Sequence, residues 1–317
     1  MLGTVSATRL IRSQLPLDLD ATLGLFVRGR HDRSTRREAP QRWWRTLHTP
    51  EGPATLLLER DGDAVRAESW GPGGAWALES APDLVGANDS LEGFSPIGLV
   101  AELHRRLPGL RMPRARTVFQ CLVLPILEQK VTGHEAQQCH LALQRALGEP
   151  APGPGSLLLP PHAKAVAELP SYEYRCLGIE AKRADTLVTA ARRARRLEEL
   201  PGLLLDDAHR RLQSIRGIGP WTSAETLRLA LGDADAVSVG DYHLPKLVAF
   251  NLLGEVQADD PRMLELLAPY AGHRGRVCTL IQLGGRELPR RGPRLPIRPF
   301  AAERERARRT FSGRGQR

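Results

Sequence analysis

The chain has 317 residues, of which 41% are hydrophobic and 26% are charged, as in soluble globular proteins. This length predicts two domains, or one large domain with appendages, and excludes a small disulfide-linked scaffold. No stretch approaches about 18 uninterrupted apolar residues, which excludes a membrane-spanning helix. The four cysteines are widely spaced single residues, so they offer neither paired zinc ligands nor an iron–sulfur cluster. They indicate a reducing, cytoplasmic setting, and the N-terminus shows no secretory signal pattern.

The positive charge is concentrated at the C-terminus. Residues 287–317 contain ten arginines and three glutamates, so this tail carries +7 of the formal net charge of +9. The tail is rich in arginine, proline and glycine with little to bury, which predicts disorder. Two interpretations stay open: a solvated tail without a specific role, or a tether that binds phosphates non-specifically.

Residues 1–92 have strand-like patterns with frequent turn signals and predict a small α+β domain built on an antiparallel sheet. Residues 55–70 predict a β-hairpin whose turn is the pair Asp61 and Gly62. The short apolar runs 23–27 and 76–78 are expected to complete the sheet. The aromatic residues of this region are expected in its core rather than in a ligand cage; they are Trp43, Trp44, Trp70 and Trp76.

Residues 93–286 have helical periodicity and predict an all-helical domain. Ser95 and Pro96 signal the first helix, and Thr132 with Glu135 forms a capping box that opens a later one. Pro125 is expected to kink or locally rearrange the helix that contains it. The predicted helices before residue 206 cover 97–107, 117–129, 133–147, 162–169 and 180–200.

A glycine hairpin lies between two predicted helices at residues 213–224. A helix that begins near Asp206 or Asp207 ends at Gly217-Ile218-Gly219, and Pro220 occupies the first position of the next helix. The glycines lack Cβ atoms, so a phosphate can approach backbone amides at a helix N-terminus, where the helix dipole favours an anion. The alternative is a plain turn between helices, because a lone GxG pattern is weak evidence.

A single aspartate follows this hairpin. Asp241 lies 24 residues after Gly217, at the start of another predicted helix. A carboxylate in this position is either an N-cap or a catalytic group that projects from the helix start.

Several dispersed motifs in this order resemble the helix-hairpin-helix DNA glycosylase superfamily, and most of all its 3-methyladenine DNA glycosylase II branch. The resemblance covers nearly everything from the N-terminal sheet to residue 284 and leaves out the tail. Its segments are 108–113, 128–132, 177–184, 217–222 and 240–242. The resemblance implies a mainly α fold, in which a helical glycosylase domain follows a smaller N-terminal α+β domain.

The implied activity is excision of a damaged base from double-stranded DNA by hydrolysis of the N-glycosidic bond. The nucleotide would be flipped out of the stack, and Asp241 would face the positive charge that develops on the sugar. His243 is a poor proton donor to the base, because two positions along a helix it points away from Asp241. A base made cationic by alkylation needs no such acid. Alkylated purines are therefore the expected substrates.

The resemblance also implies roles for individual residues. Gly217, Ile218, Gly219 and Thr222 would hold a DNA phosphate. Trp221 stands where bifunctional relatives carry a nucleophilic lysine, which favours a monofunctional enzyme. The expected base pocket consists of Trp221, Glu225, Tyr242 and Leu283.

Three positions depart from the pattern of close relatives, and their roles stay open. Glu225 and Leu283 replace pocket aromatics; Glu225 either attracts a cationic base or is a surface residue paired with Arg228. Gln129 and Lys130 occupy the DNA wedge, where relatives place an apolar residue, and Lys130 either fills the gap with its stem or binds phosphate. Trp221 is either a stacking wall or a core residue.

No redox cofactor, zinc or iron–sulfur cluster is expected. Similar hairpins bind Na⁺ or K⁺ through backbone carbonyls, which would here belong to Gln213, Ile215 and Gly217. A monomer in the bacterial cytoplasm, associated with the nucleoid, is expected. Alternative functions are a non-catalytic sensor of damaged DNA, a glycosylase for deaminated bases, and a lyase that uses Lys246 or Lys130.

Overall fold

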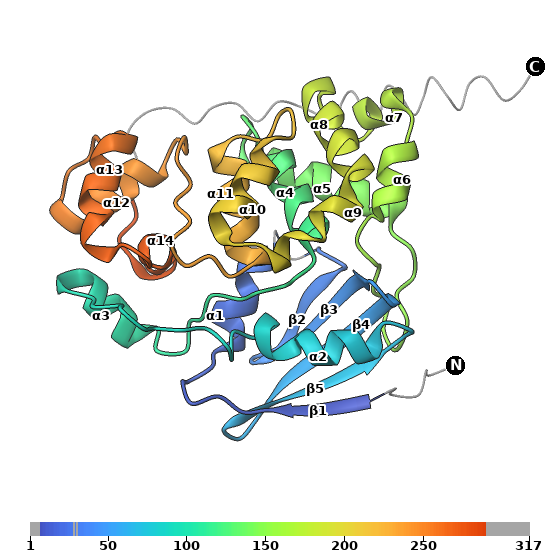
Figure 1. Cartoon of the computed structure of the whole chain (residues 1–317), viewed down its shortest axis with the longest axis horizontal. Coiled ribbons are helices and arrows are strands. Elements are labelled where there is room, and N and C mark those ends of the chain that lie inside the picture. Colours follow the sequence, from blue (N-terminus) through green and yellow to red (C-terminus); the bar gives the residue numbers. More distant parts are fainter. Residues whose placement is uncertain (1–6, 28, 30, 290–317) are drawn as a thin grey trace, which may run out of the picture.

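The computed structural model describes residues 7–27, 29 and 31–289. A five-stranded antiparallel sheet, in the order β1-β5-β4-β3-β2, forms one side of the molecule, and helices form the rest (Figure 1). The predicted mainly α fold with a smaller antiparallel sheet is thus confirmed. Most of the predicted basic tail, from residue 290 on, lies outside the described residues. The strands are β1 Ala7–Ile11, β2 Thr35–Ala39, β3 Arg42–Thr49, β4 Gly52–Asp61 and β5 Ala64–Trp70.

The hairpin between β4 and β5 forms as predicted, but its turn lies one residue further along. Asp61 pairs with Ala64, so the two loop residues are Gly62 and Asp63. Gly62 takes the positive φ of 60° that such a tight turn requires, which explains why glycine is found there.

Two segments expected as strands are helical instead. Residues 23–27 belong largely to α1 Leu19–Leu23 and to the 3₁₀ turn η1 Gly24–Phe26, and residues 76–78 lie inside α2 Gly74–Leu84. Asp18 starts α1, because its side chain accepts hydrogen bonds from the amides of Asp20 and Ala21. The runs were too short for their periodicity to separate a buried helix from a strand.

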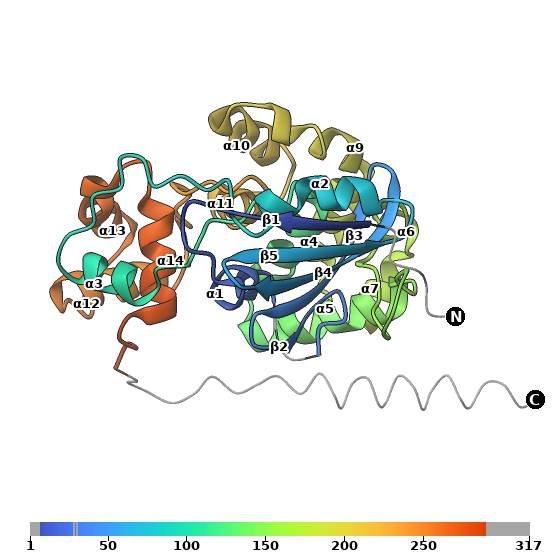
Figure 2. The same cartoon turned by 90° about the horizontal axis from the view of Figure 1, so that it is seen from below.

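Both faces of the sheet are covered. α2 packs on one face, over β1, β4 and β5 (Figure 2). On the other face, Trp44, Leu57, Trp70 and Leu157 form a separate small apolar cluster. This explains why β4 contains consecutive buried leucines rather than alternating polar and apolar residues. As predicted, Trp43, Trp44 and Trp70 are buried, while Trp76 is partly exposed.

The helical part begins after α2, and its elements agree well with the predicted ranges. One difference stands out: the segment predicted as one helix over 180–200 breaks at Arg193. Pro125 lies inside α4, and the predicted kink there stays a prediction. The elements are α3 Gly98–Arg106, α4 Val118–Glu128, α5 Gly133–Leu147, α6 Ala163–Glu168, α7 Ser171–Cys176, α8 Ala181–Arg192, α9 Ala194–Leu197, η2 Leu200–Gly202, α10 Leu205–Gln213, α11 Pro220–Ala230, α12 Leu244–Leu253, α13 Asp260–Leu267, η3 Ala268–Tyr270 and α14 Arg274–Gly284.

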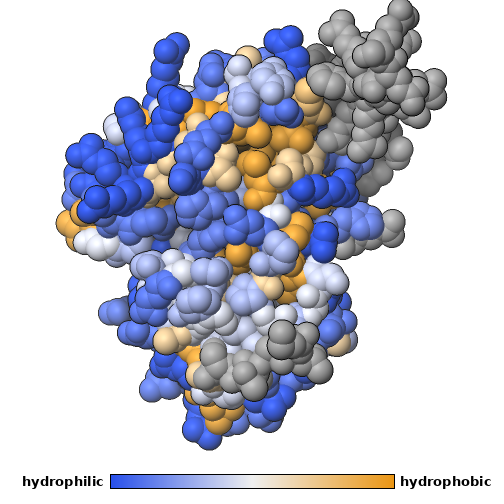
Figure 3. Space-filling model, turned by 90° about the vertical axis from the view of Figure 1, so that its right-hand side faces the viewer, coloured by the Kyte–Doolittle hydropathy of each residue, from blue (hydrophilic) through white to orange (hydrophobic). Residues whose placement is uncertain are grey.

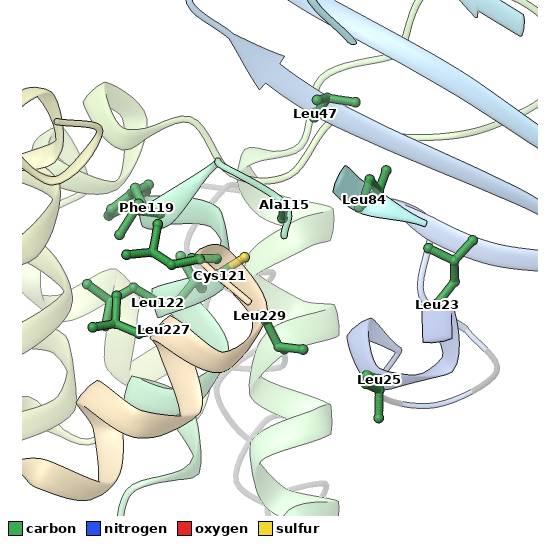
Figure 4. Packing of buried hydrophobic residues seen from close by; sticks show 14 of the residues in the cluster. Leu23, Leu25, Leu47, Leu84, Ala115, Phe119, Cys121, Leu122, Leu227 and Leu229 are labelled. Atoms are coloured by element: carbon green, nitrogen blue, oxygen red, sulfur yellow. The ribbon is translucent and has the colours of Figure 1, made fainter. Parts of the chain in front are cut away.

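One apolar core joins the sheet to the helices. It runs without interruption from Ile11 on β1 to Ile281 on α14. α4 lies near its centre, against α5, α8 and α11, and is apolar almost all round. Figure 4 shows Leu47 and Leu84 from the sheet side, and Leu122 from the helical side of the same cluster.

The surface is predominantly polar where Figure 3 shows it, on the side of the molecule at the right of Figure 1. Hydrophilic residues project from most of this face, and hydrophobic residues gather in its upper half. Within the part of the chain that the structure describes, no helix is long and apolar enough to cross a membrane.

Candidate active site

The hairpin between α10 and α11 consists of Gly217, Ile218 and Gly219, and we call it the glycine clamp. Gly217 has a φ of 92°, and a Cβ atom there would lie 2.2 Å from Oγ1 of Thr186 on α8. Only glycine fits this position. Ile218 is buried beneath the turn, whereas the space around the Cα of Gly219 is open and leads to the N-terminus of α11. The first amides of that helix have no intrahelical acceptor, so an anion can approach them.

Gln129 at the end of α4 ties this clamp to the rest of the molecule. Its Nε2 donates to the carbonyl oxygen of Gly217 and to Oγ1 of Thr222, at 2.9 Å each. Thr222 is itself buried, so its contribution to a phosphate site is limited to its backbone amide. Of the predicted wedge pair, Gln129 is therefore engaged with the hairpin. Lys130 is exposed and has a φ of 57°, which is unusual for a residue with a side chain.

Asp241 lies beside α11 and directs its two carboxylate oxygens to different partners. Its Oδ1 accepts hydrogen bonds from the amides of His243 and Leu244, at 2.8 Å each, and so caps the start of α12. Its Oδ2 accepts a hydrogen bond of 2.9 Å from the indole Nε1 of Trp221. A carboxylate oxygen can accept about two hydrogen bonds, so Oδ2 keeps acceptor capacity. The side chain is partly exposed, so a ligand can reach it.

The predicted pocket residues differ widely in their surroundings. Trp221 is partly buried against Asp241. Tyr242 is 74% exposed, and the Nζ atom of Lys246 lies 4.3 Å from the centre of its ring. Leu283, near the end of α14, is 48% exposed. The structure therefore unites Trp221 with Asp241 through a hydrogen bond. The ring of Tyr242 instead contacts His243 and Lys246.

Glu225 does pair with Arg228, but the pair is buried rather than on the surface. Two hydrogen bonds, of 3.1 and 2.7 Å, join the guanidinium to Oε2 of Glu225. Oε1 accepts a hydrogen bond of 2.5 Å from the hydroxyl of Ser238. Burial, reinforced by the negative charge of Glu225, raises the pKa of the nearby Cys278 thiol to about 12. Cys278 is therefore a neutral packing residue.

This region also contains a group of hydrogen-bonded polar side chains that was not predicted from the sequence. His209 on α10 hydrogen-bonds through Nδ1 to the hydroxyl of Ser223 and through Nε2 to Asp233, at 2.8 Å each. Ser223 is completely buried, so this Ser-His-Asp arrangement cannot present a nucleophile to a substrate. It instead fastens α10, α11 and the following loop together. Ser223 lies 14 residues and Asp233 lies 24 residues after His209, and this spacing matches no recognisable motif.

The predicted cation site involves carbonyls that already accept hydrogen bonds. The Ile215 oxygen accepts from the amide of Ile218 at 3.0 Å, and the Gly217 oxygen accepts from Gln129. A carbonyl oxygen has two lone pairs, so each retains one for a monovalent ion. These oxygens could serve as ligands of Na⁺ or K⁺ together with the carbonyl of Gln213, and the site stays a prediction. Among the described residues, no three His, Cys, Asp or Glu side chains cluster to hold a metal ion.

Comparison with known proteins places this geometry in a structural context. No protein-family model matches the chain. A protein of Bacillus subtilis (strain 168) named "Putative DNA-3-methyladenine glycosylase YfjP" is 26% identical over 162 residues. That match covers 50% of this chain and 55% of the relative, so the likeness spans about half of the relative's length.

Several solved structures match most of the chain, and two of them illustrate the likeness. A 3-methyladenine DNA glycosylase from Archaeoglobus fulgidus superposes with a TM-score of 0.74 and 18% identity, over 86% of this chain and 97% of that one. An 8-oxoguanine glycosylase/lyase from Clostridium acetobutylicum, in complex with double-stranded DNA, gives 0.67 and 14%, over 89% and 96%. The chain has the helix-hairpin-helix DNA glycosylase fold. The predicted resemblance to that superfamily is confirmed at the level of the fold. Both solved neighbours have this fold, although their names give different damaged bases.

Proposed function

We propose that this protein is a monofunctional DNA glycosylase of base excision repair that removes alkylated purines from double-stranded DNA. The observation that carries the proposal is the position of Asp241. One carboxylate oxygen is fixed by the start of α12, and the other lies against Trp221, in the first turn of the helix that follows the glycine clamp. A phosphate bound at the hairpin would therefore lie on an element next to the one that carries the carboxylate.

The chemistry asked of Asp241 is electrostatic. As the C1′–N bond lengthens, positive charge develops on the sugar, and the base departs with the bonding electrons. An alkylated, cationic base leaves as a neutral molecule. Water then adds to C1′ and releases a proton, which leaves an abasic site. A carboxylate about 4 Å from the sugar cation contributes roughly 4 kcal/mol at an effective dielectric constant near 20, or about three decades in rate.

The remaining acceleration must come from orientation of the nucleotide, exclusion of water and the reactivity of the leaving base. Trp221 supplies a flat face on which a flipped base can stack. The pocket has fewer aromatic residues than the resemblance leads one to expect. Weak stacking is tolerable for a base whose glycosidic bond is already labile, which supports alkylated purines over neutral lesions.

Release of free bases from methylated and from deaminated DNA, followed by mass spectrometry, tests the proposal. We expect release of alkylated purines by the wild-type protein and its loss in Asp241→Asn, with DNA binding largely retained. Asp259→Asn is a matched control, because Asp259 caps α13 through the amide of Arg262 at 3.1 Å. Like Asp241→Asn, this control removes a carboxylate charge at the start of a helix while an amide oxygen can still accept the backbone hydrogen bond, and it should keep the activity.

Other outcomes would replace the proposal. A wild-type protein that binds damaged DNA without releasing any base would be a sensor. Release of hypoxanthine or uracil without alkylated purines would change the lesion class. A covalent DNA adduct trapped by borohydride would indicate lyase activity through Lys246 or Lys130.

A further inference from the structure

Asp241 is carried by a loop between α11 and α12, and α11 holds this loop through a buried polar chain. Glu225 and Ser238 are 8% and 4% exposed. Oε1 of Glu225 accepts the hydrogen bond of Ser238, and the carbonyl oxygen of Ser238 accepts a hydrogen bond of 3.2 Å from the amide of Asp241. Arg228, also 8% exposed, balances the charge of Glu225 from one turn further along α11.

This chain of contacts gives Asp241 two attachments to the same helix. Trp221 holds the carboxylate, and Glu225, four residues later, holds the backbone through Ser238. Residues four apart lie on the same side of a helix. The N-terminus of α11 is also the end that faces the glycine clamp. The helix can therefore set the distance between a bound phosphate and the Asp241 carboxylate.

The same contacts argue against a direct role of Glu225 in binding a base. Both of its oxygens have donors, and Arg228 compensates its charge. A buried carboxylate is tolerated in protein when it is paired and hydrogen-bonded in this way. A cationic base would gain little attraction from an anion already neutralised by a guanidinium.

We infer that Glu225, supported by Arg228, is a positioning residue that acts on Asp241 through Ser238. The inference rests on the proposed glycosylase function, for which Asp241 is the reacting carboxylate. A misplacement of about 1 Å at a reacting group can cost on the order of 100-fold in rate. Loss of the link should accordingly slow base release more than it weakens DNA binding.

The variant Ser238→Ala tests the inference, since it removes one hydroxyl and little volume. We expect single-turnover release of alkylated purines to fall by about 10- to 100-fold, with the Kd for the same DNA changed by less than about twofold. Ser80→Ala is the matched control, because Ser80 is also 4% exposed, lies on α2 and donates only to the carbonyl of Ala77. It should leave both quantities unchanged. A release rate of Ser238→Ala within twofold of wild type would overturn the inference.

A spectroscopic measurement separates failure of this inference from failure of the proposed function. The indole N–H of Trp221 reports the position of Asp241, and its NMR signal can be assigned with Trp221→Phe. We expect Ser238→Ala to shift this signal and Ser80→Ala to leave it in place. If wild type releases no base, the proposed function fails, yet a shifted signal would still establish the link. An unmoved signal would sink the inference whatever the activity.

Discussion

At the scale of single residues, Asp241 shows why the sequence could not choose between a helix cap and a catalytic group. The carboxylate has two oxygens, and the structure uses one for the amides of α12 and directs the other to Trp221. The two interpretations are compatible. The residue type and its place before a helix could be read from the sequence. Its partner Trp221 could not, because it lies 20 residues away.

The Trp221 indole has two separable roles, in stacking and in hydrogen bonding. Trp221→Phe keeps an aromatic face and loses the N–H group that orients Oδ2 of Asp241. We expect base release to slow by about 3- to 10-fold, the cost of one lost hydrogen bond, with DNA affinity retained. Trp221→Ala should be slower still, because it also removes the stacking surface. Single-turnover kinetics measures both variants; a faster Trp221→Phe would show that the indole restrains the carboxylate.

Asp32 gives a residue-scale prediction for pH. Burial opposes ionisation, but His140, the amide of Ser34 and Gln144 outweigh it and hold the pKa of this carboxyl well below its usual range. The unfolded chain therefore binds the proton more readily. The stabilisation is complete above the unfolded pKa of about 3.9 and is lost as pH falls toward the folded value.

Urea unfolding of Asp32→Asn at several pH values tests this assignment. The variant should be less stable than wild type at pH 7, and the difference should shrink below about pH 4, where wild type loses the same contribution. Asp63→Asn, in the exposed loop between β4 and β5, should show no comparable difference. A stability difference for Asp32→Asn that is the same at pH 7 and pH 3 would contradict the assignment.

At the scale of elements, the hairpin was predictable and part of the sheet was not. Gly217, with its positive φ, and Pro220, at the first position of α11, each have a local conformational reason for their positions, so the sequence predicts the turn between α10 and α11. The apolar runs at 23–27 and 76–78 carry no such signal. The apolar spacing of α8 continues across Arg193 into α9, so the periodicity could not mark the break.

The start of α4 depends on a side chain from a distant element. Thr117 provides no side-chain cap, and the amides of Val118 and Phe119 donate instead to the carboxylate of Glu198, at 2.9 Å each. We expect Glu198→Ala to lower the free energy of unfolding by about 1 kcal/mol, as for other lost caps. Glu199→Ala serves as the control, since Glu199 makes an exposed ion pair with Arg211. Its effect should stay below about 0.5 kcal/mol in chemical denaturation, and equal effects would refute the capping role.

At the scale of the whole molecule, the positive charge of the C-terminal tail leads to a prediction about DNA binding. Removal of residues 290–317 eliminates ten arginines and two glutamates. If the tail tethers DNA non-specifically, its removal should weaken affinity and reduce the salt dependence of binding, while single-turnover release at saturating protein stays the same. Titrations of DNA at several salt concentrations measure this. An unchanged salt slope would favour a tail without a role in binding.

The buried ion pair between Arg276 on α14 and Asp89 after α2 joins the sheet region to the last helix, with a distance of 2.7 Å. The apolar cluster beneath it includes residues from both regions. The largest hydrophobic cluster is therefore shared between the sheet region and the helical region. In a calorimeter the described part of the chain should melt as one cooperative unit. An isolated fragment that contains the glycine hairpin would expose hydrophobic surface that the sheet region normally covers. We expect such a fragment to aggregate rather than to fold and bind DNA by itself.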